Sequence, residues 1–340
     1  MKALALLAAA VLLGATLPVL AGEPQAPASP ARRIPVILDT DIGTDIDDTW
    51  ALVMLLKSPE LDLKLVTTDT GNTVYRAKIV ARLLEIAGRT DVPIGIGIEQ
   101  NDDDDGPQAP WVAGYDLGRY PGKVHADGVG ALVDTIMASE TPVTLVAIGP
   151  VPNIAAALAR EPGIVRRARF VGMQGSLRRG YGDSSAIAAE ANVAGDPAAC
   201  KAVLGAAWDV TITPLDTCGL VHLTGKEYAR VAASDDPLVK ALIANYRVWW
   251  PRCPWCKDDY AKEPDRPRRE SSTLFDTVAV YLAFSRDLLA MEDLGVRVTD
   301  DGHTLIDPSQ KLLHCATRWK SLDAFEDILV QRLLGRVAHK

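Results

Sequence analysis

The sequence predicts an α/β fold: an open, mostly parallel twisted sheet with helices on both faces. Short, continuous apolar runs alternate along the chain with segments of helical periodicity. Continuous apolar strands separated by helices are typical of parallel strands that are buried on both faces. The 340 residues and the hydrophobic content of 48% are sufficient for one large core.

Six apolar runs are the expected strands, at residues 34–39, 63–69, 93–96, 143–148, 168–173 and 210–214. Segments with apolar residues three and four apart are the expected helices, at residues 47–57, 74–87, 129–139, 153–160, 197–204, 237–249 and 276–284. Asp196 before Pro197 is a typical helix start, because the acid can cap the helix and proline suits its first position.

The amino terminus has the features of a secretory signal peptide. Lys2 precedes the apolar stretch 3–20, and cleavage is expected after Ala21, although an uncleaved anchor is the alternative. Residues 22–33, rich in Pro and Ala, are expected to be a flexible linker before a folded domain at 34–340. No later segment is long and apolar enough to span a bilayer. We therefore expect a periplasmic or secreted protein without membrane attachment after cleavage.

Charge and cysteine content narrow the classes of partner and site. The formal net charge of −8 argues against a nucleic-acid partner, which requires a basic face. Cys253 and Cys256 form a C-x-x-C in an exported chain, which favours a local structural disulfide, with a zinc half-site as the alternative. The sequence leaves open the pairing of Cys200, Cys218 and Cys315 and whether the protein is a homo-oligomer.

Five aspartates follow the first predicted strand within ten residues: Asp39, Asp41, Asp45, Asp47 and Asp48. They lie on a strand-to-helix turn that Gly43 makes flexible. Helix capping explains one or two acids at such a turn, but not five. Carboxylate oxygens are the ligands that Ca²⁺ and Mg²⁺ prefer. The cluster therefore predicts a divalent metal site, and the carboxyl ends of parallel strands are where ligands bind in such sheets.

The segment from Asp39 to Asp48 resembles the amino-terminal signature of the inosine-uridine preferring nucleoside hydrolase family. The usual form is Asp-x-Asp-x-Gly-x-Asp-Asp, and two extra residues stand here between the glycine and the paired acids. The resemblance extends over most of residues 34 to 285. It implies a Rossmann-like sheet of the nucleoside hydrolase type. The implied activity is Ca²⁺-dependent cleavage of the N-glycosidic bond of small-molecule ribonucleosides to free base and ribose.

The resemblance also implies site residues. The calcium ligands would be Asp41, Asp48, Asp276 and the backbone carbonyl of Ile148, which occupies a position where the family commonly has threonine. The sugar hydroxyls would be bound by Asn72, Glu190 and Asn192. Aligned from the helix, Asp47 is the general base. Aligned from the glycine, Asp45 takes one of the places of the paired acids. The helix alignment is favoured, because a helix fixes side-chain direction more tightly than a loop does.

The leaving-group acid is the open question. Where the family has a histidine before the distal aspartate, this chain has Phe275, which cannot donate a proton. His125, in a loop resembling the family's His-Gly-x-Asp-Gly, is one candidate donor, and a water supported by a Tyr or Trp of the segment 246–255 is another. Phe275, Trp249 or Trp250 could stack on the base, although the two tryptophans could equally be core residues of a helix. An exported nucleoside- or sugar-binding protein of the same fold, with weak or no hydrolysis, is the alternative function. The sequence does not give the base preference.

Overall fold

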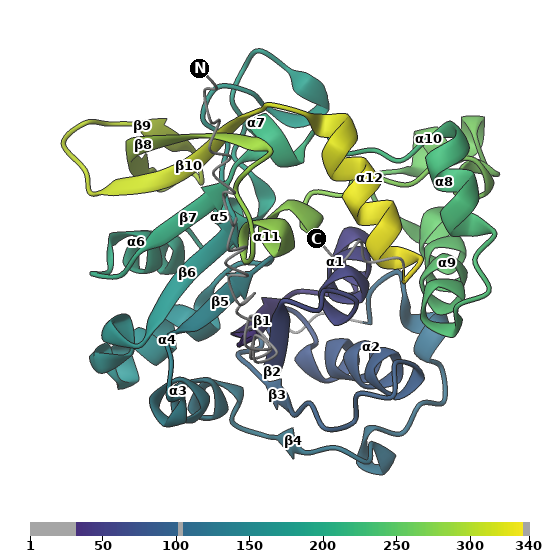
Figure 1. Cartoon of the computed structure of the whole chain (residues 1–340), viewed down its shortest axis with the longest axis horizontal. Helices are drawn as coiled ribbons and strands as arrows, with labels where there is room; N and C mark the ends of the chain where they lie inside the picture. The colour runs from purple at the N-terminus through teal and green to yellow at the C-terminus, as the bar shows by residue number, and fades with distance from the viewer. Residues whose placement is uncertain (1–31, 101–104, 336–340) are drawn as a thin grey trace, which may run out of the picture. The chain divides into compact units, whose positions relative to one another are not determined.

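The computed structural model describes residues 32–100 and 105–335, and from Arg33 onward the chain forms one compact unit (Figure 1). The predicted signal peptide at 1–21 and nearly all of the linker at 22–33 lie outside the described residues. No helix in the described ranges combines the length and apolar character that crossing a bilayer requires.

A ten-stranded sheet in the order β4-β3-β2-β1-β5-β6-β7-β10-β8-β9 organises the fold. β1 to β7 are parallel, β10 runs parallel to β7, and β8 and β9 add an antiparallel edge. All six predicted strands are present, so the predicted fold class is confirmed. The strands are β1 (Ile34–Thr40), β2 (Leu61–Thr68), β3 (Ile94–Ile96), β4 (Val124–His125), β5 (Val143–Ala147), β6 (Ala168–Met173), β7 (Val210–Thr213), β8 (Leu289–Val298), β9 (Thr304–Ile306) and β10 (Leu312–Trp319).

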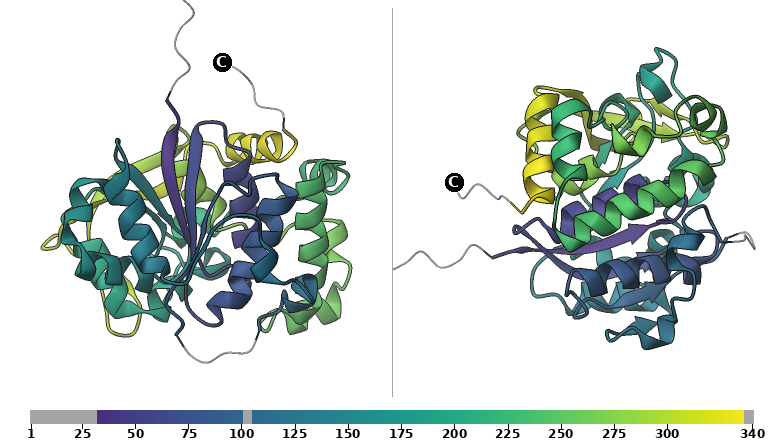
Figure 2. Two further views of the ribbon diagram at one scale, coloured as in Figure 1. Left: turned by 90° about the horizontal axis from the view of Figure 1, so that it is seen from below. Right: turned by 90° about the vertical axis from the view of Figure 1, so that its right-hand side faces the viewer.

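Helices cover both faces of the sheet (Figure 2). Val36 and Leu38 of β1 point into one core, whereas Ile37 points into the other. Because both cores are apolar, successive residues of β1 from 34 to 38 are all apolar, and this part of the strand shows no alternation of apolar and polar residues. The helices are α1 (Asp47–Leu56), α2 (Thr73–Ile86), α3 (Gly128–Ala138), α4 (Pro152–Arg160), α5 (Ala191–Gly195), α6 (Pro197–Gly205), α7 (Leu215–Cys218), α8 (Gly225–Ala232), α9 (Pro237–Trp249), α10 (Lys257–Lys262), α11 (Thr277–Leu282) and α12 (Leu322–Leu333).

The seven predicted helices correspond to α1, α2, α3, α4, α6, α9 and α11. Several start with side-chain caps: Asn72 accepts from the Tyr75 N–H at the start of α2, and Asp196 accepts from the Ala199 N–H at the start of α6. The prediction placed no element after residue 284. The structure has three strands and α12 there, and β10 lies beside β7 as part of the main sheet.

Candidate active site

The connection from β1 to α1 passes residues 41–46 over the carboxyl edge of the sheet. Gly43 has φ +112°, and a Cβ atom there would lie 2.7 Å from Cε1 of Tyr75. The Tyr75 hydroxyl donates to the Gly43 carbonyl (3.2 Å). Only glycine combines this backbone conformation with so close an aromatic ring. The turn therefore fixes where the following acids begin.

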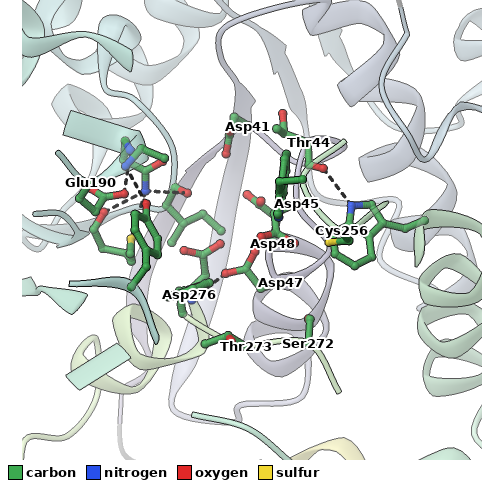
Figure 3. Close-up of a pocket in the computed structure, with 18 of the residues that line it drawn as sticks. Asp41, Thr44, Asp45, Asp47, Asp48, Glu190, Cys256, Ser272, Thr273 and Asp276 are labelled. Atoms are coloured by element: carbon green, nitrogen blue, oxygen red, sulfur yellow. Dashed lines mark hydrogen bonds between the residues drawn. The ribbon is translucent and has the colours of Figure 1, made fainter. Parts of the chain in front are cut away.

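Three buried carboxylates meet at this edge. Ligand atoms of Asp47, Asp48 and Asp276 lie within 4.8 Å of one another. The Asp276 N–H donates to Oδ2 of Asp47 (3.2 Å), and the Thr40 hydroxyl donates to Asp48. Asp41 lines the same cavity without joining this close group (Figure 3). Residues from the start of α1 and the start of α11 thus form one cluster.

Burial and mutual repulsion disfavour ionisation of the cluster. Burial raises the pKa of Asp47, Asp48 and Asp276 well above the usual aspartate range, and neighbouring aspartates raise it further. Burial likewise raises the pKa of Asp45 to about 7. Arg76 lowers the pKa of Asp41, against the larger effect of burial. The Arg76 guanidinium donates hydrogen bonds to the carbonyls of Ile42 (3.0 Å) and Thr70 (2.8 Å).

The donor set fits a hard divalent cation. It consists of carboxylate oxygens with the backbone of Ile148 in the same cavity, and soft sulfur or imidazole ligands are absent from the close group. Arg76 alone cannot balance the charge of the acids that it faces. Asp41, Asp48 and Asp276 are the carboxylates that would hold the ion, and Asp47 lies beside them.

The cluster opens into a cavity of about 590 Å³. Figure 3 shows Glu190 and Cys256 on opposite sides, with the acids between them. Besides the acids, the lining includes aromatic, polar and charged side chains: Thr44, Ile148, Met173, Tyr181, Glu190, Asn192, Trp249, Trp250, Trp255, Asp259, Arg266, Ser272, Thr273 and Phe275. An acidic region beside aromatic rings suits a polar group joined to a flat ring.

Glu190 and Asn192 are held firmly in this lining. The Glu190 carboxylate accepts from the backbone N–H groups of Gly175 (2.9 Å), Asn192 (2.7 Å) and Val193 (3.3 Å). Burial raises its pKa to about 7. The Asn192 amide donates to the carbonyls of Met173 (3.0 Å) and Ile148 (3.4 Å). Both residues therefore organise the loop between β6 and α5 as well as face the cavity.

Comparison with known proteins decides the family. A model of the inosine-uridine preferring nucleoside hydrolase family matches residues 36–333. The chain belongs to this family. This nucleoside hydrolase is therefore an N-ribosyl hydrolase, a class that acts on small-molecule nucleosides, and the metal dependence of the family agrees with the acid cluster.

Relatives of this nucleoside hydrolase differ in the base specificity that their names give. The non-specific ribonucleoside hydrolase of Klebsiella pneumoniae is 33% identical over 63% of this chain and 73% of its own length. The pyrimidine-specific ribonucleoside hydrolase of Enterobacter sp. is 33% identical over 62% of this chain and 68% of its own. A solved plant nucleoside hydrolase superposes with a TM-score of 0.72 at 25% identity, covering 89% of this chain and 99% of the other. Family membership alone does not fix the base.

Two predicted site residues of this nucleoside hydrolase lie outside the described cavity lining. Asn72 caps α2 and donates to Asp105 (3.0 Å). His125 is half-buried in β4, at the edge of the sheet and separated from β1 by β3 and β2. Asp47, Asp45, Glu190, Asn192, Phe275, Asp41, Asp48, Ile148 and Asp276 all line the cavity. The sugar-binding role of Asn72 and the catalytic role of His125 stay predictions.

The cavity lining also contains Tyr181 and Arg266, which were not predicted, and Trp255, which was predicted only as part of the segment 246–255. Trp255 carried a signal, because it lies inside the C-x-x-C, whose disulfide is present between Cys253 and Cys256. Tyr181 follows an Arg-Gly loop with no distinguishing pattern. Its ring packs edge-on against Phe275, with centroids 6.0 Å apart, and only the fold brings the two together.

Proposed function

We propose that this nucleoside hydrolase is an exported, Ca²⁺-dependent enzyme that releases ribose and free base from ribonucleosides in the periplasm or outside the cell. The observation that carries the proposal is the close group of Asp47, Asp48 and Asp276 in a cavity that also holds aromatic rings. The charged start and apolar stretch of residues 1–21 support export.

Asp41, Asp48, Asp276 and the Ile148 carbonyl would hold the calcium ion. The bound ion would supply a site for the sugar hydroxyls and would lower the pKa of a water molecule. An oxygen-only donor set supports Ca²⁺ or Mg²⁺ over softer metals. Glu190 and Asn192 are fixed by backbone contacts and would orient the sugar, which lowers the entropy cost of reaching the transition state.

Asp47 would act as general base. The water oxygen bonds to C1′ of the ribose while its proton passes to Asp47, and the C1′–N bond breaks with its electron pair on the base. The base then needs a proton, which Phe275 cannot give. His125 is one of the candidate donors from the sequence, and the cavity also offers the hydroxyl of Tyr181. That hydroxyl accepts from the Ala191 N–H (2.9 Å), which leaves its own proton free to donate.

Ribose release from inosine, uridine and cytidine by the purified protein tests the proposal. Activity should disappear in chelator and return with Ca²⁺. Asp48→Asn should abolish activity, whereas Asp134→Asn, an exposed acid on α3, should not. Mass spectrometry of protein from the extracellular or periplasmic fraction should show a chain that begins at Gly22. No ribose from any nucleoside would overturn hydrolysis.

The alternative is an exported nucleoside- or sugar-binding protein, and Phe275 is the feature that favours it. Such a protein would bind inosine or ribose with measurable affinity in calorimetry, without releasing ribose. Binding without turnover, in protein that retains its metal, would decide for this alternative.

A further inference from the structure

One side of the cavity is formed by residues 249–256, which lead from α9 through η5 (Trp250–Arg252) to α10. Two of the three tryptophans in this segment are fixed. Trp249 is 1% exposed and its indole donates to the Thr44 carbonyl (2.9 Å). Trp250 is 2% exposed and donates to the Glu263 carbonyl (2.9 Å). Both rings are packed into the core and have little freedom to adapt to a ligand.

Trp255 differs from these two. It lines the cavity with 57% of its surface exposed, and it meets Trp249 edge-on with centroids 6.3 Å apart. Its indole N–H has no hydrogen-bond acceptor among residues 32–100 and 105–335. A tryptophan with so much free apolar surface in a cavity is suited to contact a ligand.

A disulfide closes the loop that carries Trp255. Cys253 and Cys256 are bonded and are 2% and 7% exposed. The Cys253 N–H donates to the Trp249 carbonyl (2.9 Å), and the Tyr260 N–H donates to the Cys256 carbonyl (2.7 Å). Both ends of the loop are therefore attached to helices. The bridge leaves the backbone around Trp255 few conformations.

We propose that the Cys253–Cys256 disulfide is a positioning element that holds Trp255 where its face stacks on the base of a bound nucleoside. The inference rests on the proposed function, because it requires a nucleoside in the cavity. The acids take the sugar, and Trp255 and Tyr181 are the most exposed aromatic residues of the lining. Stacking on an aromatic face is tolerant of base identity, so nucleoside affinity should depend on the disulfide for purines and pyrimidines alike.

Steady-state hydrolysis of inosine and uridine tests the role of Trp255. Trp255→Ala should raise KM on the order of 10-fold with little change in kcat, because stacking is shared by substrate and transition state. Trp255→Phe should restore most of the affinity. Tyr260→Ala is the matched control, since Tyr260 lies on the adjoining helix α10, is 37% exposed and is outside the cavity lining. An unchanged KM in Trp255→Ala would overturn the proposal.

A combined variant tests whether the disulfide acts through Trp255. Replacing both cysteines by serine should raise KM as Trp255→Ala does, and should add nothing in the Trp255→Ala background. If the increases in KM caused by the two changes multiply in the combined variant, the bridge is merely structural and the proposal is overturned. If the serine variant does not fold, a phosphine reductant replaces it. The phosphine gives two electrons to the bridge and takes oxygen from water, leaving phosphine oxide and two thiols.

Failure of the proposed function would look different. If the wild-type protein releases no ribose from any nucleoside, hydrolysis is overturned, and the same variants are compared by the calorimetric Kd for inosine. A Kd that rises about 10-fold in Trp255→Ala and in the reduced protein, and no further when both changes are combined, supports the positioning role. A Kd unaffected by either change overturns it.

Discussion

Asp47, Asp48 and Asp276 are 2–3% exposed, and the Asp276 backbone donates to Asp47. Charged carboxylates so close and so far from water cost the fold stability unless a proton or a cation neutralises them. Burial is the largest cause of their raised pKa, and repulsion among them is the next. The cluster is therefore better explained by a ligand than by any contribution to folding.

At the scale of single residues, the first prediction concerns the general base. Asp47→Ala should lower kcat roughly 10²- to 10⁴-fold, the usual contribution of a general base, while calcium measured by elemental analysis stays bound. Asp45→Ala should be mild by comparison, because its carboxylate already accepts from the Ile46 N–H (2.6 Å). The opposite pair of phenotypes would show that the two extra residues were aligned wrongly. Loss of calcium in Asp47→Ala would make it a ligand instead.

Phe275 gives the second prediction. Without a histidine before Asp276, substrates whose base leaves readily should react fastest, so a nitrophenyl riboside should be hydrolysed faster than inosine or uridine. Phe275→His should raise kcat for inosine by at least about 10-fold, since a positioned general acid typically contributes about 10²-fold or more. The nitrophenyl riboside is the internal control and should change little. Equal rates for inosine and the riboside in the wild-type protein would show that another residue already protonates the departing base.

Among the elements, the turn between β1 and α1 determines the direction in which the acids enter the cavity. Thr40 ends β1 and donates to Asp48, and Gly43 lets the chain turn under the ring of Tyr75. α1 itself begins at Asp47 without a side-chain cap from the residue before it. Positions of the first two helical side chains thus depend on the turn.

Gly43→Ala should reveal this dependence. Its φ of +112° is strained for alanine by about 1–3 kcal/mol, and its Cβ would meet Tyr75, so both stability and calcium affinity should fall. Gly88→Ala is the matched control, because Gly88 also has a positive φ (+66°) but its Cβ would meet nothing within 4 Å. Urea unfolding and calcium titration measure the two effects. If the two variants have the same stability and the same calcium affinity, the turn does not position the acids.

The sequence was most informative for the parallel part of the sheet. Strands such as β1 are buried on both faces and therefore appear as continuous apolar runs, and α6 starts at the predicted Asp-Pro pair. β8 and β9 were missed because buried, half-buried and exposed residues are mixed along these antiparallel strands, which gives no such run. α12 was missed although it packs into the same core as α1.

For the site, sequence proximity was the useful signal. The five aspartates could be recognised because they lie within ten residues, and Asp276 could be recognised through the resemblance. Tyr181 could not be assigned, and Trp255 only within a longer segment, because both reach the cavity on loops whose course depends on distant contacts, such as that of Trp249 with Thr44. His125 shows the converse, since a residue in a suggestive motif lies in the edge strand β4.

Considered as a whole, the molecule concentrates buried negative charge at one edge of the sheet. Burial raises the pKa of Asp45 and Glu190 to about 7 in the folded protein, against about 4 in an unfolded chain. Between these values the folded state binds more protons than the unfolded state. Without metal, the free energy of unfolding should therefore fall as pH rises from about 4 to 7.

Urea unfolding in chelator and in Ca²⁺ checks this. In chelator the midpoint should be lower at pH 8 than at pH 5. Added Ca²⁺ should raise the midpoint more at pH 8, because the ion competes with protons for the same carboxylates and stabilises only the folded state. If the urea midpoint in chelator is no lower at pH 8 than at pH 5, the raised pKa of these buried carboxylates is contradicted.

The contact between Asp47 and Asp276 joins residues that are 229 positions apart in the chain. A ribosome that has made the first two hundred residues has made the acid-rich turn but not the carboxylate that completes the group. Calcium can therefore act only after synthesis of α11 and docking of its start against α1. In refolding of the complete chain, a contact between residues so far apart closes a long loop and is expected to form after the transition state, where interactions affect unfolding more than folding. Calcium should then lengthen the lifetime of the native protein while leaving its refolding rate nearly unchanged.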